Sequence, residues 1–414
     1  MPGLIAPRKE DAGQLGLNRS LNWGSQAASN LVTGPLVDRL SARNVLVWTH
    51  VARGALLAAA SGLFFSLSGA AVALPVLGLV PAFIVAFQAI TALHGFLQAT
   101  SMTAGSVAFN RILGPDRAHY DRANAVYNVV VSVAGVIGPL LAGALIVAFG
   151  YALAYAGYGA ILVAAGLGFT TLRVPGDAAP KVRGEPRRGR LKELGEGFRL
   201  VWSSRFLRLT TLLSSLYLLA ADSLVFTALP RYLKDVLGPS LPAWAAAGGA
   251  FGLYLSVASA GLVLSALAAA FWRGRARPVL RAGSLDAQDR AGRLTGIVSG
   301  LGFLLYWAVF FSPGLWASLG AMFAVTLLQG AALVVWAGLY QDVIRTHAPR
   351  DMGKVYAALG FYQLVLSIAG ILGFSWLMAE LPTVSALWIV GGVMTAVAVS
   401  QVAQALLVFP SKPR

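Results

Sequence analysis

The sequence predicts an all-α protein that crosses a membrane many times. Its 414 residues are 57% hydrophobic and only 12% charged, and its mean hydropathy of +0.71 is far above that of an average soluble domain. Long apolar runs alternate with short basic segments, a pattern typical of polytopic helical membrane proteins. The bilayer therefore replaces the large hydrophobic core of a soluble fold.

Runs of about 20 apolar residues mark the membrane spans in chain order. Ten runs are clear, and an eleventh, 14–36, is too polar to be assigned from hydropathy alone. No cleavable signal peptide is expected, because residues 1–13 lack an apolar stretch. The ten clear spans are predicted at 45–67, 74–105, 122–148, 151–172, 207–229, 244–271, 294–312, 315–341, 355–379 and 384–409.

Basic residues predict the orientation of these spans. When alternate loops are assigned to the two sides, 26 Lys and Arg residues fall on one side and only Arg231 and Lys234 on the other. The positive-inside rule places the larger set in the cytoplasm, together with the C-terminus. Because the net charge of +16 arises mostly in these loops, nucleic acid is not expected as a partner.

The composition gives no support to an enzyme or a metalloprotein. The chain has no cysteine and only four scattered histidines, which excludes disulfides and thiolate sites and disfavours a metal centre. No nucleophile–base pair and no metal-ligand set stands out. We therefore predict no catalytic residue, no metal and no cofactor.

A long basic segment, 173–206, divides the chain into an N-terminal half, 1–172, and a C-terminal half, 207–414. Its start is rich in Pro, Gly and Arg and is typical of a linker. The following "RLKELGEGFRLVWSSRFLRL" alternates aromatic and basic residues, which predicts an amphipathic helix on the inner membrane face. A plain solvated linker is the alternative.

An internal repeat supports this division into halves. "YNVVVSVAGVIG" from Tyr127 aligns without a gap with "YQLVLSIAGILG" from Tyr362, with six of twelve positions identical. Parallel repeats of this kind form the architecture of a large transporter class, whose substrate site lies near the membrane midplane between the halves.

Polar residues recur at helical spacing inside several spans. Such residues are costly in lipid, so they face either a cavity or another helix, with interhelical hydrogen bonding as the simpler interpretation. The candidate cavity residues are Asn18, Asn22, Gln26 and Asn30 on the weak span, Asn124, Asn128 and Ser132 on span 122–148, and Gln363 and Ser367 in the repeat.

Asp222 is the most informative of the charged residues inside a span. It lies roughly midway between Arg208 and Arg231 in the sequence and shares a helix face, within about 40°, with Thr211 and Ser215. A carboxylate near the middle of a membrane is the expected place for proton coupling. We therefore predict that these three residues contribute to a polar cavity or to coupling.

Arg53 is a second charged residue inside a span, and His50 lies one turn before it. At 1.5 Å per residue Arg53 lies about 13 Å along its helix from Asn44, so its long side chain can extend to the cytoplasmic interface. We expect Arg53 to be mainly structural.

The stretch "GPLVDRLSARNVL" resembles the loop motif that follows the second span of the major facilitator superfamily. The resemblance implies that Gly34, Asp38, Arg39 and Arg43 form a conformational latch. Asp38 would face a helix N-terminus and nearby arginines, where a carboxylate is stabilised by the helix dipole and charge-assisted hydrogen bonds. For the arginines alone, simple positive-inside anchoring is the alternative.

This alignment with the family has a consequence for the start of the chain. If 14–36 is the second span of the family, the first span is absent and about eleven spans are present. We expect an in-frame coding extension upstream of Met1, with natural loss of the span or an N-terminus folding back from the cytoplasm as alternatives.

Two further stretches resemble members of this family that export their substrates. "GVIGPLLAG" resembles the Gly-Pro motif of the fifth span and implicates Gly135, Gly138, Pro139 and Gly143, although Ala142 stands where a second glycine is common. "LKELGEGFRLVWSSRFLRL", followed by "LPRYLKDVLG", resembles the branch that contains the enterobactin exporter and drug-efflux carriers.

The fourth span departs from the family pattern. Many proton-driven members carry an arginine four residues before a glycine there. Here Thr91 occupies the arginine position, with His94 directly before Gly95. The resemblance therefore does not by itself imply the family's usual proton relay for this chain.

Together, these resemblances imply a monomeric secondary transporter of the inner membrane. It would export a small amphipathic molecule by alternating access, with the lipid bilayer and the substrate as partners and proton coupling left open. A lipid or lysolipid translocator of the same fold is one alternative. A non-transporting membrane receptor or scaffold is an alternative of another class.

Overall fold

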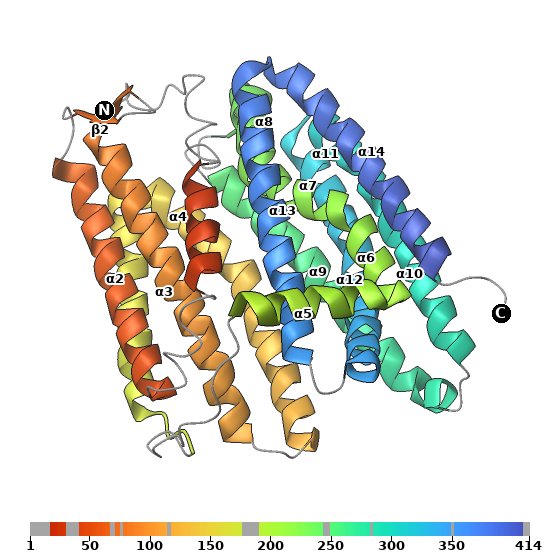
Figure 1. Cartoon of the computed structure of the whole chain (residues 1–414). Helices are drawn as coiled ribbons and strands as arrows, with labels where there is room; N and C mark the ends of the chain where they lie inside the picture. The colour runs from red at the N-terminus through yellow and green to blue at the C-terminus, as the bar shows by residue number, and fades with distance from the viewer. Residues whose placement is uncertain are drawn as a thin grey trace. The chain divides into compact units, whose positions relative to one another are not determined.

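The protein is helical, as the sequence predicts, and forms two compact units (Figure 1). The N-terminal unit holds the described residues of 17–131 and 141–175, and the C-terminal unit those of 190–408 together with Ser132–Leu140. The computed structural model describes residues 17–29, 41–66, 71–74, 78–113, 117–175, 190–242, 249–281, 285–348 and 352–408.

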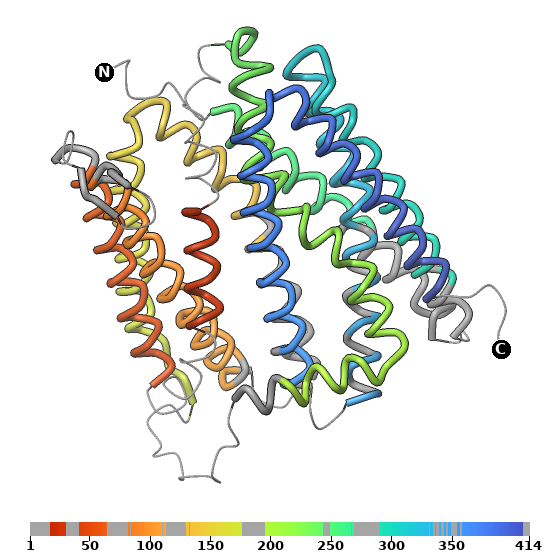
Figure 2. Tube along the Cα trace, turned by 45° about the horizontal axis from the view of Figure 1, so that its top comes forward, coloured from red at the N-terminus to blue at the C-terminus, as the bar shows by residue number. Residues whose placement is uncertain are grey.

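The N-terminal unit is built from a helix at 17–29 and three longer helices. These are α2 (Ala42–Ser66), α3 (Ala82–Leu113) and α4 (Arg117–Gly168), and α4 ends in the 3-10 turn η1 (Phe169–Thr171). α2 and α3 run side by side, as Figure 2 shows. They share a small core of buried aliphatic side chains: Ala42, Val45, Leu46, Ala104 and Ala108.

A small hairpin precedes α3. Strands β1 (Ala71–Leu74) and β2 (Gly78–Pro81) pair antiparallel, with Ala71 opposite Pro81. The helix of this span therefore begins at Ala82, whereas the hydropathy predicted a start at 74. Hydropathy cannot separate a short apolar strand from a helix end, because both present the same apolar residues.

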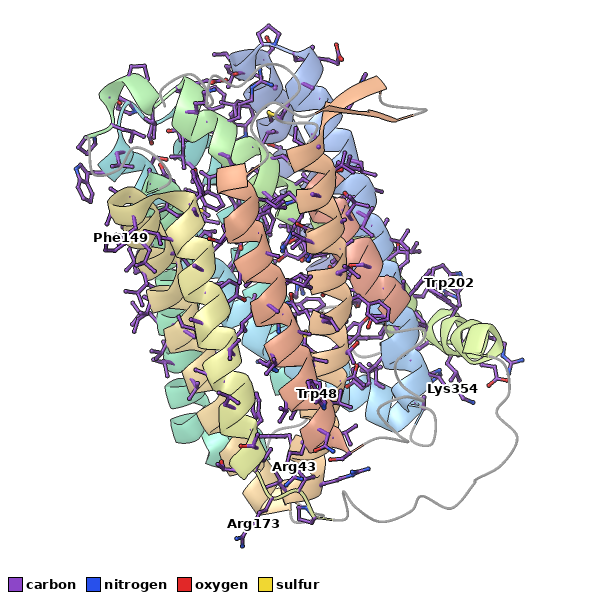
Figure 3. All side chains as sticks on the ribbon, turned by 90° about the vertical axis from the view of Figure 1, so that its left-hand side faces the viewer. Arg43, Trp48, Phe149, Arg173, Trp202 and Lys354 are labelled. Carbon is purple, nitrogen blue, oxygen red and sulfur yellow. The ribbon has the colours of Figure 1, made fainter. Side chains whose placement is uncertain are left out.

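Gly150 divides α4 into the two helices that were predicted as spans 122–148 and 151–172. Its φ of 76° and ψ of 173° lie in a backbone region that is essentially restricted to glycine. Figure 3 shows Phe149, next to this break, at one end of the N-terminal unit and Arg173 at the other, on the same end as Arg43. The two labelled arginines of this unit thus share one end.

The C-terminal unit contains the remaining helices. One span is interrupted: α6 (Arg205–Leu213), α7 (Ser215–Ser223), the π-helical turn η2 (Leu224–Ala228) and α8 (Leu229–Asp235) follow each other directly. The others are α5 (Arg190–Ser203), η3 (Gly238–Ser240), α9 (Gly249–Arg281), α10 (Leu285–Leu304), α11 (Tyr306–Phe311), α12 (Leu315–His347), α13 (Met352–Glu380) and α14 (Thr383–Val408).

An aromatic cluster forms the centre of this unit. The ring of Tyr232 meets Phe310 edge-on at 5.4 Å between centroids, and Tyr306 stacks between Phe303 and Phe310 at 6.1 and 6.3 Å. These rings are buried in one core with the aliphatic side chains of α9, α12 and α14. Such pairs add specific geometry to the burial of apolar area.

The segment predicted as an amphipathic helix begins with α5, which lies across the ends of other C-terminal helices (Figure 1). Lys354 Nζ on α13 donates to Glu196 Oε2 at 2.7 Å. A Cβ at position 197 would collide with the backbone of Lys354, so Gly197 permits the close approach of the two helices. Val201 is fully buried and Trp202 is exposed, which gives α5 one packed face.

Several helices of the described residues can cross a membrane, judged by length and composition. This supports a multi-pass membrane protein, while the total of eleven spans stays a prediction. Six stretches qualify: Ala42–Leu63, Val133–Thr171, Arg205–Asp235, Gly292–Phe311, Lys354–Glu380 and Thr383–Val408. Gly249–Ser265 and Leu315–Gly330 are shorter apolar helices.

Candidate functional site

A cavity of about 310 Å³ lies within the N-terminal unit. The helix at 17–29, α2, α3 and the second part of α4 each contribute to its wall. The wall combines three aromatic rings with amide, hydroxyl, imidazole and guanidinium groups. Its lining residues are Asn18, Arg19, Asn22, Leu57, Ala60, Phe87, Ile90, Thr91, His94, Gln98, Tyr155 and Tyr158.

The amide stripe of the weak span reaches this cavity. Asn22 is buried, and its Nδ2 donates to the backbone oxygen of Thr91 at 3.1 Å. Gln26 Nε2 donates in turn to Asn22 Oδ1 at 2.8 Å. Asn18 Oδ1 is buried without a hydrogen-bond partner among the described residues. The stripe thus provides helix contacts at Asn22 and Gln26, and an open acceptor at Asn18.

Gly95 allows the helix at 17–29 to lie close against α3. A Cβ at this position would collide with the backbone oxygen of Asn22 and lie 2.6 Å from Ser25 Oγ. One turn further along, the hydroxyls of Ser29 and Thr100 are 3.0 Å apart. Backbone approach at a small residue, with polar contacts beside it, is a typical membrane helix interface.

Arg53 differs from the sequence-based expectation. Its side chain is 7% exposed, and its Nε donates to His94 Nε2 at 3.3 Å instead of extending to the interface. Tyr158 is a further polar neighbour of this side chain. The prediction of snorkelling was wrong because distance along the helix says nothing of the direction in which the side chain points. Arg53 lies directly behind two residues of the cavity wall.

The hydrogen bond from Arg53 defines the protonation state of His94. An arginine Nε–H can only donate, so Nε2 of His94 must accept and cannot carry a proton. The imidazole is therefore neutral in this arrangement, with its proton on Nδ1. The ring of His94 lies 6.4 Å from that of Tyr158, and Phe87 packs edge-on against Tyr155 at 5.7 Å.

The polar residues predicted on α6 and α7 meet other helices of the C-terminal unit. The hydroxyls of Thr211 and Tyr340 are 3.4 Å apart, and those of Ser215 and Tyr362 are 2.6 Å apart. Asp222 is half-buried on α7, and only Ser223 separates it from the π-helical turn. Thr211 and Ser215 thus make interhelical contacts.

The repeat residues of α13 have different environments. Ser367 is buried and its hydroxyl donates to the backbone oxygen of Leu218 at 3.3 Å. Gln363 is exposed. Of their predicted counterparts Asn124, Asn128 and Ser132, the structure describes only the helical backbone of α4.

The Gly-Pro residues lie on α4. Pro139 is inside the helix, and Gly135, Gly138 and Gly143 keep helical backbone angles around it. A Cβ at Gly135 would be 3.4 Å from Ser259 Oγ of α9, whereas the space at Gly138 is open. This segment, Ser132–Leu140, groups with the C-terminal unit.

Most of the predicted latch lies outside the described residues. Gly34, Asp38 and Arg39 belong to that part of the chain, as does Asn30 of the amide stripe. Arg43 is described: it is exposed in the first turn of α2. The latch therefore stays a prediction.

Sequence reasoning missed the aromatic part of the cavity. Phe87, Tyr155 and Tyr158 lie in apolar runs, where nothing distinguishes them from lipid-facing residues. Arg53 and His94 did carry a usable signal, because ionisable residues inside a span are costly and usually face a cavity. Their closeness becomes visible only once α2 and α3 are packed together.

Comparisons with known proteins agree with the fold. Residues 9–374 match the family described as Major Facilitator Superfamily. A variant of the nucleoside transporter NupG aligns with a TM-score of 0.67 and 14% identity, covering 95% of this chain and 91% of that one. A bacterial homologue of the iron transporter ferroportin, in an inward-facing state, aligns with a TM-score of 0.62 and 14% identity over 95% and 90%.

Relatives by sequence carry one name, multidrug efflux pump Tap. The protein from Mycobacterium tuberculosis (strain ATCC 25618 / H37Rv) is 26% identical over 272 residues, which is 63% of this chain and 58% of that relative. The protein from Mycolicibacterium fortuitum is 28% identical over 346 residues, or 80% and 72%. The match thus spans 58% of the length of the first relative. With the family match extending over residues 9–374, the chain belongs to the major facilitator superfamily.

Proposed function

We propose that this protein exports small amphipathic molecules across the inner membrane by alternating access. The observation that carries the proposal is the cavity of the N-terminal unit, whose wall combines aromatic rings with polar groups. Ligand sites are typically apolar clefts with a few polar groups that orient the ligand. The name of the Tap relatives supports efflux as the direction.

The aromatic side of the cavity fits a flat apolar group. Phe87 and Tyr155 pack edge-on at 5.7 Å, and Tyr158 lies on the same part of the wall near His94. A planar ring that contacts these side chains gains both buried area and favourable ring geometry. The amides of Asn18 and Gln98 supply hydrogen-bonding groups beside them.

For the Gly-Pro residues of α4 we hypothesise a role in export: they prevent ions from leaking through the transport path. The small residues of α4 allow close helix contact, as at Gly135 opposite Ser259. In our proposal this interface keeps the transport path closed to ions during the cycle. Pro139, which lacks a backbone donor, would keep the helix locally deformable.

Asp222 is our candidate for coupling to protons. It is half-buried on α7, and the next five residues, Leu224–Ala228 after Ser223, form a π-helical turn. Such turns are frequent at functional sites. A carboxylate inside a span binds and releases a proton during a cycle more readily than it stays charged in lipid.

Everted membrane vesicles test the proposed direction. With an imposed pH gradient, vesicles that carry the full chain should accumulate an amphipathic aromatic dye above the level of vesicles without it. Tyr155→Ala should reduce this uptake several-fold, since Tyr155 lines the cavity. Tyr151→Ala, one turn away and exposed, is the matched control.

Two results would contradict the proposal. One is dye flux equal to that of empty vesicles, and the other is equal loss in Tyr155→Ala and Tyr151→Ala. A fluorescent lysolipid in the same vesicles separates export of a soluble amphiphile from lipid translocation, because only a translocator would move the lysolipid between leaflets.

A further inference from the structure

The cavity stands beside a buried positive charge. Arg53 is 7% exposed, its Nε donates to His94 Nε2 at 3.3 Å, and Tyr158 is a further polar neighbour. His94 is neutral in this arrangement. Among the residues that the structure describes, no carboxylate forms an ion pair with Arg53. Within the described part of the chain, its charge is therefore met by neutral groups and is not balanced by an acid.

The sequence explains why no acid lies on the helical segments that surround the cavity. From residue 12 to residue 176 the chain contains three acidic residues, Asp38, Asp116 and Asp121. The helix at 17–29, α2, α3 and the part of α4 after Gly150 contain none. Burial of an ionised guanidinium is expensive unless an opposite charge accompanies it. The helical segments that surround the cavity therefore do not supply that charge.

The cavity wall in front of Arg53 presents hydrogen-bond donors. His94 accepts from Arg53 at Nε2 and so keeps a donor, Nδ1–H. Tyr158, which also contacts Arg53, lines the same cavity. Arg19 adds a second guanidinium to the wall, with its Cζ 5.1 Å from the ring centre of Trp23. No lining residue is acidic.

We propose that this cavity selects aromatic molecules with a carboxylate or another anionic group over their cationic analogues. The anion supplies the charge that balances Arg53, reaching it through His94 and Tyr158, while the ring contacts Phe87 and Tyr155. Charge-assisted hydrogen bonds in a water-poor site are the strong ones. The inference rests on the proposed function, because it names the substrate class of the same cavity.

Three small probes of one ring system test the charge preference. 1-Naphthaleneacetate, 1-naphthaleneacetamide and 1-naphthylmethylamine differ mainly in charge. Binding to the purified full chain in nanodiscs is measured by titration of intrinsic fluorescence. We expect the acetate to bind at least about tenfold more tightly than the amide, and the amine to bind most weakly. Equal affinity for all three, or tightest binding of the amine, overturns the inference.

Variants locate the preference at Arg53. Arg53→Gln should remove the advantage of the acetate over the amide, and Arg53→Lys should retain part of it. Arg173→Gln, in the same unit but exposed, is the matched control and should keep the full preference. A thermal melt reports folding of each variant. If Arg53→Gln fails to fold, the comparison of probes on the wild type and on Arg53→Lys still decides.

The test separates this inference from the proposed function. If dye export proceeds in vesicles but the acetate has no advantage in binding, the exporter stands and the charge selection fails. If the acetate binds through Arg53 but no probe moves in vesicles, the charge selection stands and export fails. If an acidic side chain of the protein itself balances Arg53, the three probes bind alike, which also overturns the inference.

Discussion

Two arginines, one partly exposed and one buried, show how differently the two units treat charge. In the C-terminal unit, Arg231 Nε lies 3.2 Å from Asp235 Oδ2 and 2.9 Å from Thr383 Oγ1, so an acid balances it. In the N-terminal unit, Arg53 Nε donates to the neutral His94, and no carboxylate of the described residues pairs with it. The first arrangement is complete by itself, whereas the second gains from an anion supplied by a ligand.

The comparison extends to the packing of each unit. The C-terminal unit buries stacked rings and joins some hydroxyl groups to neighbouring helices, as at Ser215 and Tyr362, while other buried hydroxyls there, such as that of Tyr232, have no hydrogen-bond partner among the described residues. The N-terminal unit lines a cavity with polar side chains, one of which, Asn18, keeps an unsatisfied acceptor. Halves that share a sequence repeat therefore need not share the chemistry of substrate binding.

The largest effect is expected where the cavity wall depends on a single small residue. Gly95→Leu would push the helix at 17–29 away from α3, because its side chain has no room beside Asn22. Overpacking costs about 1–3 kcal/mol and more where the backbone must move. We expect loss of binding and a lower melting temperature in detergent. Gly157→Ala, which adds a Cβ in open space, is the control; equal melting curves for Gly95→Leu and wild type would refute the packing argument.

The second prediction concerns the acid of the C-terminal unit. Asp222→Asn should leave the melting temperature and naphthaleneacetate binding nearly unchanged, since the cavity lies in the other unit. It should abolish accumulation of the dye against a gradient while downhill flux persists, because the amide cannot carry a proton. Vesicle uptake with and without an imposed pH gradient measures both. If this variant accumulates the dye to the wild-type level, Asp222 has a structural role and does not couple transport to protons.

A smaller effect is expected at the Gly-Pro residues of α4. The double variant Gly138→Leu and Pro139→Ala stiffens and widens the helix where Ser132–Leu140 groups with the C-terminal unit. We expect a several-fold increase of proton leak in proteoliposomes and a partial loss of export. Gly168→Ala, also in open space, is the control. If proton leak and export are both unchanged, the Gly-Pro segment serves only helix packing.

The smallest effect is expected at the ion pair of α5. Glu196 and Lys354 are 2.7 Å apart but keep 21% and 31% of their side chains exposed, so solvent screens the pair. A double-mutant cycle with Glu196→Gln and Lys354→Gln should give a coupling of about 0.5 kcal/mol in thermal unfolding. If added salt does not weaken the coupling energy, the pair is not screened by solvent and the argument from its exposure is wrong.

The fold follows from sequence more closely than the site does. Hydropathy predicted spans at 355–379 and 384–409, and the helices run over Met352–Glu380 and Thr383–Val408. Such helices are visible in sequence because lipid requires a continuous apolar surface and internal backbone hydrogen bonds. The hairpin before α3 escaped prediction, since it is equally apolar.

The cavity could be predicted only in part. The amides of the weak span were predicted as cavity residues, because polar residues are unusual inside a span. Asn22 does line the cavity. Phe87 and Tyr155 were not visible, because aromatic residues face lipid, core and ligand alike. Arg53 shows the remaining limit: its position along α2 is readable, but its rotation about the helix depends on how α3 packs.

The contacts between α5 and α13 indicate where the chain can be divided into two fragments. Residues 175 and 190 are joined by the fourteen residues 176–189, so the covalent link reaches about 50 Å at most. A break within 176–189 would leave α5 with the second polypeptide, held by Lys354 and the contact at Gly197. The first polypeptide would carry Ser132–Leu140, whose Gly135 meets Ser259 on the second. Co-expressed fragments therefore have a recognition surface of their own, and this junction is the place to divide the gene.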